Sequence, residues 1–300
     1  MESVTIPRSA TSPAFAADAV PVARVPPGTV VIFETTDEPY RSLASGVPVD
    51  RSALERFNLV SGPLAVEGIE PGDVLRVDIL EITIERAWLV FLRSYGPLGD
   101  LLPETLCKQL SIEAGRLVVS SRLRLPVRPS IGCLGLAPRS GRTSTFRPVR
   151  PWGGNLDLPE LAPGSTVWLP VQRPEGYLYV GDVHAAMGAG EPAHVGIEAA
   201  ARVRVRVDRS QGLCCPAPRI RTTGELLFVG IGETVTVAQR HALEHAVGAL
   251  RNEYGLASSE AYALASACLS YRFGGPAGPV VLAAVPLDVL AQLPASATPS

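Results

Sequence analysis

Three segments of the chain repeat one unit, a Pro-Gly turn followed at once by β-branched residues, and this unit most constrains the fold. The segments begin at Pro26, Glu70 and Ala162 and read PPGTVVIFET, EPGDVLRVDILEI and APGSTVWLPV. Proline fixes the first turn angle, glycine takes the positive-φ position, and Val, Ile and Thr favour extended chain. We therefore expect each segment to be a turn that leads into a β-strand.

Other segments extend this β-rich pattern. Residues 201–209, ARVRVRVDR, alternate strictly and predict a strand with its valines inward and its arginines outward. Apolar runs at 225–232 and 278–287 indicate two more strands, with two helices between them. We predict a mainly β (α+β) protein whose sandwich or barrel sheets end in a C-terminal strand–helix–helix–strand segment.

The first predicted helix lies within residues 237–255 and the second begins near Ser258 or Ser259. In the first, an apolar stripe through Leu243 and Leu250 predicts the buried face. We divide the chain into an N-terminal β domain, 1–150, and a second segment, 151–300, packed together as one unit.

The composition excludes several classes of protein. With 27 basic and 29 acidic residues the net charge is −2, and no basic stripe is present, which argues against nucleic-acid binding. Five cysteines without paired spacing indicate reduced thiols. No signal peptide and no apolar run of membrane-spanning length are found, so we expect no membrane association and a cytoplasmic protein.

The stretch 176–191, GYLYVGDVHAAMGAGE, carries the chemistry of greatest interest. In extended chain, residues i and i+2 share a face, so Asp182 and His184 can converge on one cation at the exit of the Tyr177 strand. Glycines 188 and 190 allow the next loop to fold back and bring Glu191 to the same point. Carboxylates and an imidazole suit Zn²⁺ or a similar ion, but a hydrogen-bonded turn has the same pattern.

Three other motifs allow a functional and a structural interpretation. HALEH, with His241 and His245, matches the H-x-x-E-H pattern of zinc peptidases, but we predict that both histidines face solvent. In IGCLGLAP, 131–138, Cys133 is either a nucleophile or a small buried residue, and we favour the latter. In GGNLD, 153–157, the amide and the acid offer ligand contacts or an Asx-turn.

Taken in order, several motifs of this chain resemble those of the acetamidase/formamidase family. They include FETTDEPY, NLVSGPLAVEGIEPGDVL, IGCLGLAP, GGNLD, GSTVWLPV, GYLYVGDVHAAMGAGE and SSEAYALASACLS. The resemblance implies jelly-roll-like sheets, hydrolysis of short aliphatic amides such as acetamide or formamide, a divalent metal (zinc first, calcium as the alternative), and a homodimer or higher homo-oligomer. Matching positions imply Asp37, Asp182 and His184 near the metal, with Glu191 as ligand or base.

The same resemblance suggests that Asn155 and Asp157 line the pocket. We predict Glu191, Asp182 and His184 as catalytic, and Gly132, Cys133 and Gly135 as substrate contacts whose backbone N–H groups would stabilise an oxyanion.

The chain departs from the family pattern at Met187 and Ala189, where an amide and an acid are usual. These differences motivate the alternative of a non-catalytic metal- or small-ligand-binding β-protein. A thiol amidase that uses Cys133 is a third, weaker interpretation.

Overall fold

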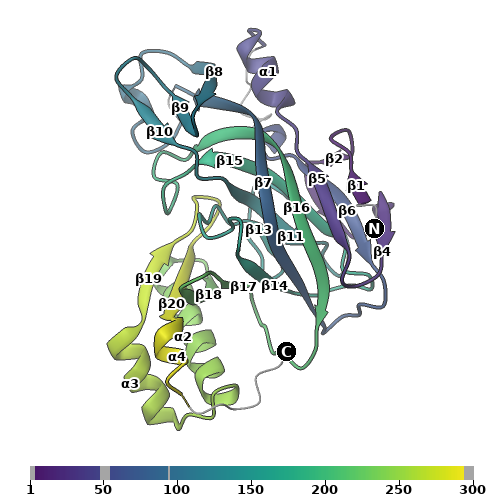
Figure 1. Ribbon diagram of the computed structural model, residues 1–300, viewed down its shortest axis with the longest axis vertical. Coiled ribbons are helices and arrows are strands. Elements are labelled where there is room, and N and C mark those ends of the chain that lie inside the picture. Colours follow the sequence, from purple (N-terminus) through teal and green to yellow (C-terminus); the bar gives the residue numbers. More distant parts are fainter. Residues whose placement is uncertain (1–3, 48–54, 94, 294–300) are drawn as a thin grey trace.

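The computed structural model describes residues 4–47, 55–93 and 95–293, and it is mainly β (Figure 1). The strands are β1 (Val4–Ile6), β2 (Thr11–Ser12), β3 (Ala14–Ala16), β4 (Ala23–Val25), β5 (Val30–Glu34), β6 (Val60–Val66), β7 (Val74–Phe91), β8 (Leu106–Glu113), β9 (Arg116–Val118), β10 (Arg124–Pro126), β11 (Ser130–Leu136), β12 (Arg142–Ser144), β13 (Gly153–Asn155), β14 (Thr166–Pro170), β15 (Leu178–Ala186), β16 (Ile197–Ser210), β17 (Arg219–Arg221), β18 (Glu225–Ile231), β19 (Ser270–Phe273) and β20 (Val280–Pro286). The helices are α1 (Glu38–Ala44), α2 (Val235–Asn252), α3 (Ser258–Cys268) and α4 (Leu287–Leu290), with one 3-10 turn at Gly99–Leu101. The predicted fold class, mainly β with a C-terminal α+β segment, is confirmed.

The three Pro-Gly units fold as expected. Gly28, Gly72 and Gly164 adopt φ values of 84°, 96° and 89°, which are accessible to glycine at little cost. Each turn leads within two residues into β5, β7 or β14. The local sequence therefore defines the starts of three strands.

Strands β7 and β16 are the longest and run side by side through the sheet (Figure 1). They pair antiparallel along the whole length of β16, which also pairs with β5 and β15. Val203, Val205 and Val207 are fully buried, and Arg202 on the other face donates to Glu34 at 3.0 Å. The predicted inward and outward faces of this strand are confirmed.

Strands from the two predicted segments alternate in the sheet. Besides the β7–β16 pair, β15 pairs with β6 and with β11, and β14 pairs with β7. A division at residue 150 thus crosses shared ladders, and it stays a prediction. These ladders matter for the site because they place β15 between β11 and β16.

The C-terminal unit has a core of its own. Helix α2 packs on β18 and β20, at the lower left of Figure 1. Ala238 and Ala242 lie so close to Gly230 that a Cβ there would be 2.0 Å from a helix carbonyl oxygen. The buried face therefore runs through alanines, and Leu243 of the predicted stripe is only partly buried.

The prediction that His241 and His245 face solvent is wrong. Their Nδ1 atoms lie 2.7 Å from the Ile231 carbonyl oxygen and 2.9 Å from that of Val229. Val229 donates its N–H to Pro218, which has no N–H to return, so the Val229 carbonyl needs another donor. Each imidazole supplies one, and the pair therefore completes the edge of β18.

None of the helices in the described part of the chain is both long and apolar enough to cross a membrane.

Candidate active site

Four buried carboxyl groups surround the imidazole of His184. Its Nε2 atom lies 3.4 Å from Glu198 Oε1, 3.6 Å from Glu191 Oε1 and 4.0 Å from Asp182 Oδ1. Asp157, His184 and Glu191 form a second arrangement, with one candidate ligand atom from each lying within 4.8 Å of the others. Three of the four acids had been singled out in the sequence, and the structure brings them together.

The sheet explains how distant residues meet here. Strand β15 does not end at Gly181 but continues to Ala186, so Asp182 and His184 are both strand residues. In the β15–β16 ladder His184 lies opposite Glu198. Asp157 follows β13, which pairs with β11, the other neighbour of β15, and Glu191 lies in the loop from β15 to β16.

Glycines make room for these side chains. A Cβ on Gly196 would lie 2.5 Å from His184 Cδ2, and one on Gly132 would lie 2.6 Å from His184 Cε1. A Cβ on Gly275 would lie 2.3 Å from the Asp157 carboxyl group. The cluster is therefore enclosed by backbone, which permits little rearrangement of the imidazole.

Three of the four acids have a left-handed backbone conformation. Asp157, Asp182 and Glu191 have φ values of 46°, 52° and 40°. The left-handed region costs non-glycine residues on the order of 1 kcal/mol or more, although Asp tolerates it better than most. Such strain is typical of functional sites.

Two neutral side chains hold the acids in place. Asn58 donates from Nδ2 to Asp182 Oδ2 at 2.9 Å and to Asn155 Oδ1 at 2.7 Å. The Tyr40 hydroxyl donates to Glu198 Oε2 at 2.7 Å, while the Gly196 N–H lies 3.1 Å from Oε1.

The environment separates the protonation states of the cluster. Burial raises the pKa of Asp157 far above its usual range, that of Asp182 to about 7 and that of Glu191 to about 8. For Glu198 burial also disfavours ionisation, but His184 and the Tyr40 hydroxyl outweigh it and lower the pKa. Burial disfavours the His184 imidazolium, yet the carboxylates, with Glu198 first, raise its pKa well above the ordinary value.

The donor set fits a divalent cation. Both Asp157 oxygens and His184 Nδ1 are buried and have no hydrogen-bond partner among the described residues. Buried polar atoms of this kind are costly unless something pairs with them. Carboxylate oxygens and imidazole nitrogen, without thiolate, suit Zn²⁺ and related ions.

A small cavity of ≈ 60 Å³ opens onto the cluster. Asp157, Asp182, Glu191 and Glu198 line it on the polar side. The remaining lining residues are Tyr40, Phe57, Asn58, Val90, Leu92, Tyr95, Phe146, Arg147, Asn155, His194, Val195, Pro276 and Ala277. The size and the partly apolar walls suit a ligand of a few heavy atoms.

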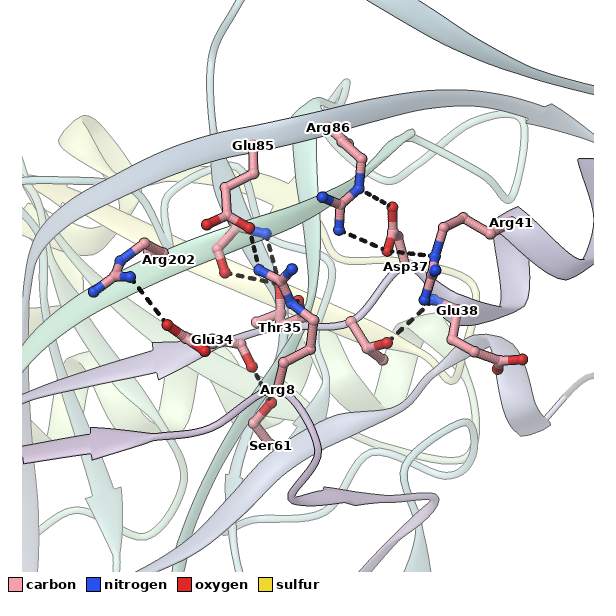
Figure 2. A network of polar contacts seen from close by, with 12 residues as sticks. Arg8, Glu34, Thr35, Asp37, Glu38, Arg41, Ser61, Glu85, Arg86 and Arg202 are labelled. Carbon is pink, nitrogen blue, oxygen red and sulfur yellow. Dashed lines mark hydrogen bonds and ion pairs between the residues drawn. The ribbon is translucent and has the colours of Figure 1, made fainter.

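Asp37, expected near the metal, belongs to neither candidate ligand group. Its oxygens accept from Arg86 Nε at 2.6 Å and Nη2 at 3.0 Å, from Trp88 Nε1 at 3.0 Å and from Arg41 Nε at 3.2 Å. In Figure 2 the two arginines approach this carboxylate from either side. Because these donors occupy both oxygens, we remove Asp37 from the ligand set.

The predicted substrate contacts divide into two groups. Asn155 and Asp157 line the cavity, whereas Gly132, Cys133 and Gly135 are not among the described residues that do. These three lie within strand β11, not in a turn, and Cys133 is fully buried with a pKa raised far above normal by that burial. The structure gives no support to a Cys133 nucleophile or to an oxyanion site at these glycines.

Sequence reasoning missed Glu198, Tyr40 and Asn58. A signal for Glu198 was present, because it is the only charged residue in the apolar run 195–201, VGIEAAA. Such a residue in a buried strand needs a partner. Tyr40 and Asn58 reach the site only through tertiary contacts.

The match to a family model covers nearly the whole chain. Residues 13–141 and 136–291 match the Acetamidase/Formamidase family. The chain belongs to that family. The resemblance found in the sequence motifs is thereby confirmed.

Curated members of the Acetamidase/Formamidase family are similar over part of the chain. A formamidase of Methylophilus methylotrophus is 27% identical in an alignment of 211 positions that covers 51% of this chain and 52% of that protein. A putative formamidase of Schizosaccharomyces pombe is 27% identical in an alignment of 216 positions that again covers 51% of this chain and 52% of that protein. The alignment thus spans about half the length of these relatives.

Solved structures of the family match along almost the entire chain. An acetamidase from Bacillus halodurans has a TM-score of 0.87 at 31% identity, covering 97% of this chain and 100% of that one. A predicted acetamidase/formamidase from Thermoanaerobacter tengcongensis has a TM-score of 0.89 at 27% identity, with 97% and 98% covered. A γ-lactamase from Delftia acidovorans, TM-score 0.59 at 21% identity and 93% and 88% covered, shares the fold.

The two departures from the family pattern lie outside the cavity. Met187 and Ala189 precede Glu191 in the β15–β16 loop, and neither is among the described lining residues. Gly190 of this loop approaches Phe273 of β19 instead. Glu191 itself remains in the cluster.

Proposed function

We propose that this protein is a metal-dependent amidohydrolase that cleaves short aliphatic amides, such as acetamide or formamide, to carboxylate and ammonia. One observation carries the proposal: four carboxyl groups, with unpaired buried atoms among them, gather around His184 and line a cavity of ≈ 60 Å³. Membership of the Acetamidase/Formamidase family and the names of the relatives support it.

In this proposal Asp157, His184 and Glu191 hold the cation, with Asp182 and Glu198 beside them. Zinc is the first choice, because an imidazole and carboxylates match its preferences, and calcium is the alternative. When bound, the ion would supply Lewis-acid polarisation of the amide carbonyl.

Glu191 is the proposed proton carrier. Burial and the neighbouring carboxylates favour its protonated form, so one carboxyl oxygen would take a proton from water and pass it to the departing nitrogen while the other helps to hold the ion. Asn58 and Tyr40 fix Asp182 and Glu198, and the apolar walls limit the water that reaches the cluster.

The direct test measures ammonia release from formamide, acetamide, propionamide, benzamide and urea, before and after treatment with chelator and zinc. We expect turnover of the short amides that requires the added ion and is lost in His184→Ala. Glu34→Gln, which removes an acid outside the cavity, is the matched control and should retain activity. Turnover by His184→Ala at the wild-type rate would refute the assignment.

The alternative is a non-catalytic protein on the same scaffold. It predicts zinc or calcium binding without release of ammonia from any member of the panel. Cytoplasmic location and a homodimer or higher homo-oligomer remain proposals from the sequence, the latter open to test by light scattering.

A further inference from the structure

Helix α1 contributes Tyr40 to the lining of the cavity and so brings a hydroxyl group to the cluster. Tyr40, in its first turn, is buried and donates to Glu198 Oε2 at 2.7 Å. The ring packs with Trp88 and Val90 of β7 and lies 5.8 Å, between centroids, from the Phe57 ring. Tyr40 is the only side chain among the described residues that donates to this carboxylate, apart from His184.

Helix α1 cannot hold this position unaided. It has seven residues, and isolated helices shorter than about 12 residues are marginal in water. The residue before it, Asp37, is fully buried and accepts the backbone N–H groups of Tyr40 and Arg41 through its carbonyl oxygen, at 3.1 and 3.0 Å. The first turn is therefore tied directly to Asp37.

Asp37 is tied in turn to strand β7. Arg86 donates two hydrogen bonds to its carboxylate, and Trp88, two residues along the same strand, donates a third. We call these three hydrogen bonds the clamp. Figure 2 shows Arg86 descending from its strand onto Asp37 while Arg41 reaches back from α1. Trp88 thus contacts both the Asp37 carboxylate and the Tyr40 ring, the two groups that this inference connects.

We propose that Asp37 is a positioning residue that acts through Tyr40, because its clamp on β7 fixes the first turn of α1 and so keeps the Tyr40 hydroxyl on Glu198. With Oε2 held by Tyr40 and Oε1 by the Gly196 N–H, the carboxylate stays turned toward His184. Loss of the clamp frees Tyr40, and the Glu198 carboxylate then loses its orientation. The kinetic part of this inference rests on the proposed function.

A double-mutant cycle tests this inference. The variants are Tyr40→Phe, which removes only the hydroxyl, Asp37→Asn, and the two combined. We expect each single change to lower both zinc affinity, measured by chelator competition, and kcat by up to about 10-fold, because Glu198 is the carboxylate that orients the proposed ligand His184. Because both act on one hydrogen bond, the combined variant should fall no further than the worse single variant, within about twofold.

Two more variants sharpen the test. Glu34→Gln removes an acid of the same polar network that pairs with Arg202 and does not touch α1, so it should change neither quantity by more than about twofold. Should Asp37→Asn fail to fold, Arg86→Lys replaces it. Arg86 is partly exposed, and lysine keeps the positive charge but cannot donate the two parallel hydrogen bonds to the Asp37 carboxylate.

The outcomes are distinct. Multiplied losses in the combined variant, or wild-type zinc affinity in a folded Asp37 or Arg86 variant, would overturn the inference. No ammonia release by the wild type would overturn the proposed function, while the zinc affinities would still decide whether Asp37 acts through Tyr40.

Discussion

The metal-free protein should lose stability as the pH rises from 5 to 8, and the loss should be traceable to single residues of the cluster. Asp182 and Glu191 have pKa values of about 7 and about 8 in the fold, against ordinary values of 3.8 and 4.5. A group whose pKa is raised by folding stabilises the folded state while the pH lies below its unfolded pKa. That contribution is lost as the pH rises toward the folded value.

The size of this pH dependence follows from how many more protons the folded state binds than the unfolded state. Each extra proton on the folded state lowers the unfolding free energy by about 1.4 kcal/mol per pH unit. Near pH 6 Asp182 and Glu191 together hold nearly two, so the slope approaches about −2.7 kcal/mol per unit. Asp157 and His184, whose pKa values are raised, act in the same direction. Glu198, whose pKa is lowered, adds nothing to this slope, because its contribution to stability is constant above its usual pKa and is lost only as the pH falls below that value.

Urea unfolding at pH 5, 6, 7 and 8 in the presence of chelator measures this slope. Glu191→Gln mimics the protonated side chain, so it should match the wild type at pH 5, exceed it at pH 8 and reduce the slope by about 1.4 kcal/mol per unit. Added zinc should flatten or reverse the slope, because the ion displaces the protons. Stability that is constant or rises with pH in chelator would refute the reasoning.

Three further changes test separate parts of the structure. Gly196→Ala would place a Cβ 2.5 Å from His184 Cδ2, so we expect about 1–3 kcal/mol less stability in urea and at least about 100-fold slower ammonia release; near-normal turnover would contradict the site geometry. Iodoacetamide on the native protein should leave Cys133 unmodified by mass spectrometry and activity intact, and labelling with inactivation would restore the thiol mechanism. Asp37→Ala removes the acceptor of the partly exposed Arg86 guanidinium and of the buried Trp88 Nε1, and should cost about 1–3 kcal/mol in urea; an unchanged midpoint would show that these hydrogen bonds contribute nothing.

Local patterns in the sequence predicted what local chemistry decides. The Pro-Gly turns at Gly28, Gly72 and Gly164 begin strands because proline and glycine set the backbone there. Asp182 and His184 come together on β15 at positions i and i+2, as the alternation of a strand predicts, although Asp182 itself has a φ of 52°. Such features need no knowledge of what lies opposite.

Features that depend on pairing between distant strands were not visible in the sequence. Glu198 meets His184 because of the β15–β16 register, and Asp37 is in neither candidate ligand group because Arg86 of β7 binds its carboxylate. His245 faces the sheet because Pro218 has no N–H to donate to the Val229 carbonyl oxygen, which the His245 imidazole contacts instead. In each case a tertiary partner overrides the expectation drawn from the residue's own neighbours.

Anomalous scattering at the zinc edge, from crystals grown with zinc, tests most directly whether these side chains form a metal centre. The account predicts a peak inside the cluster, about 2.0–2.2 Å from a His184 nitrogen and from carboxylate oxygens of Asp157 and Glu191. A cluster without a peak, with zinc bound instead at a site such as His241 and His245, would contradict it.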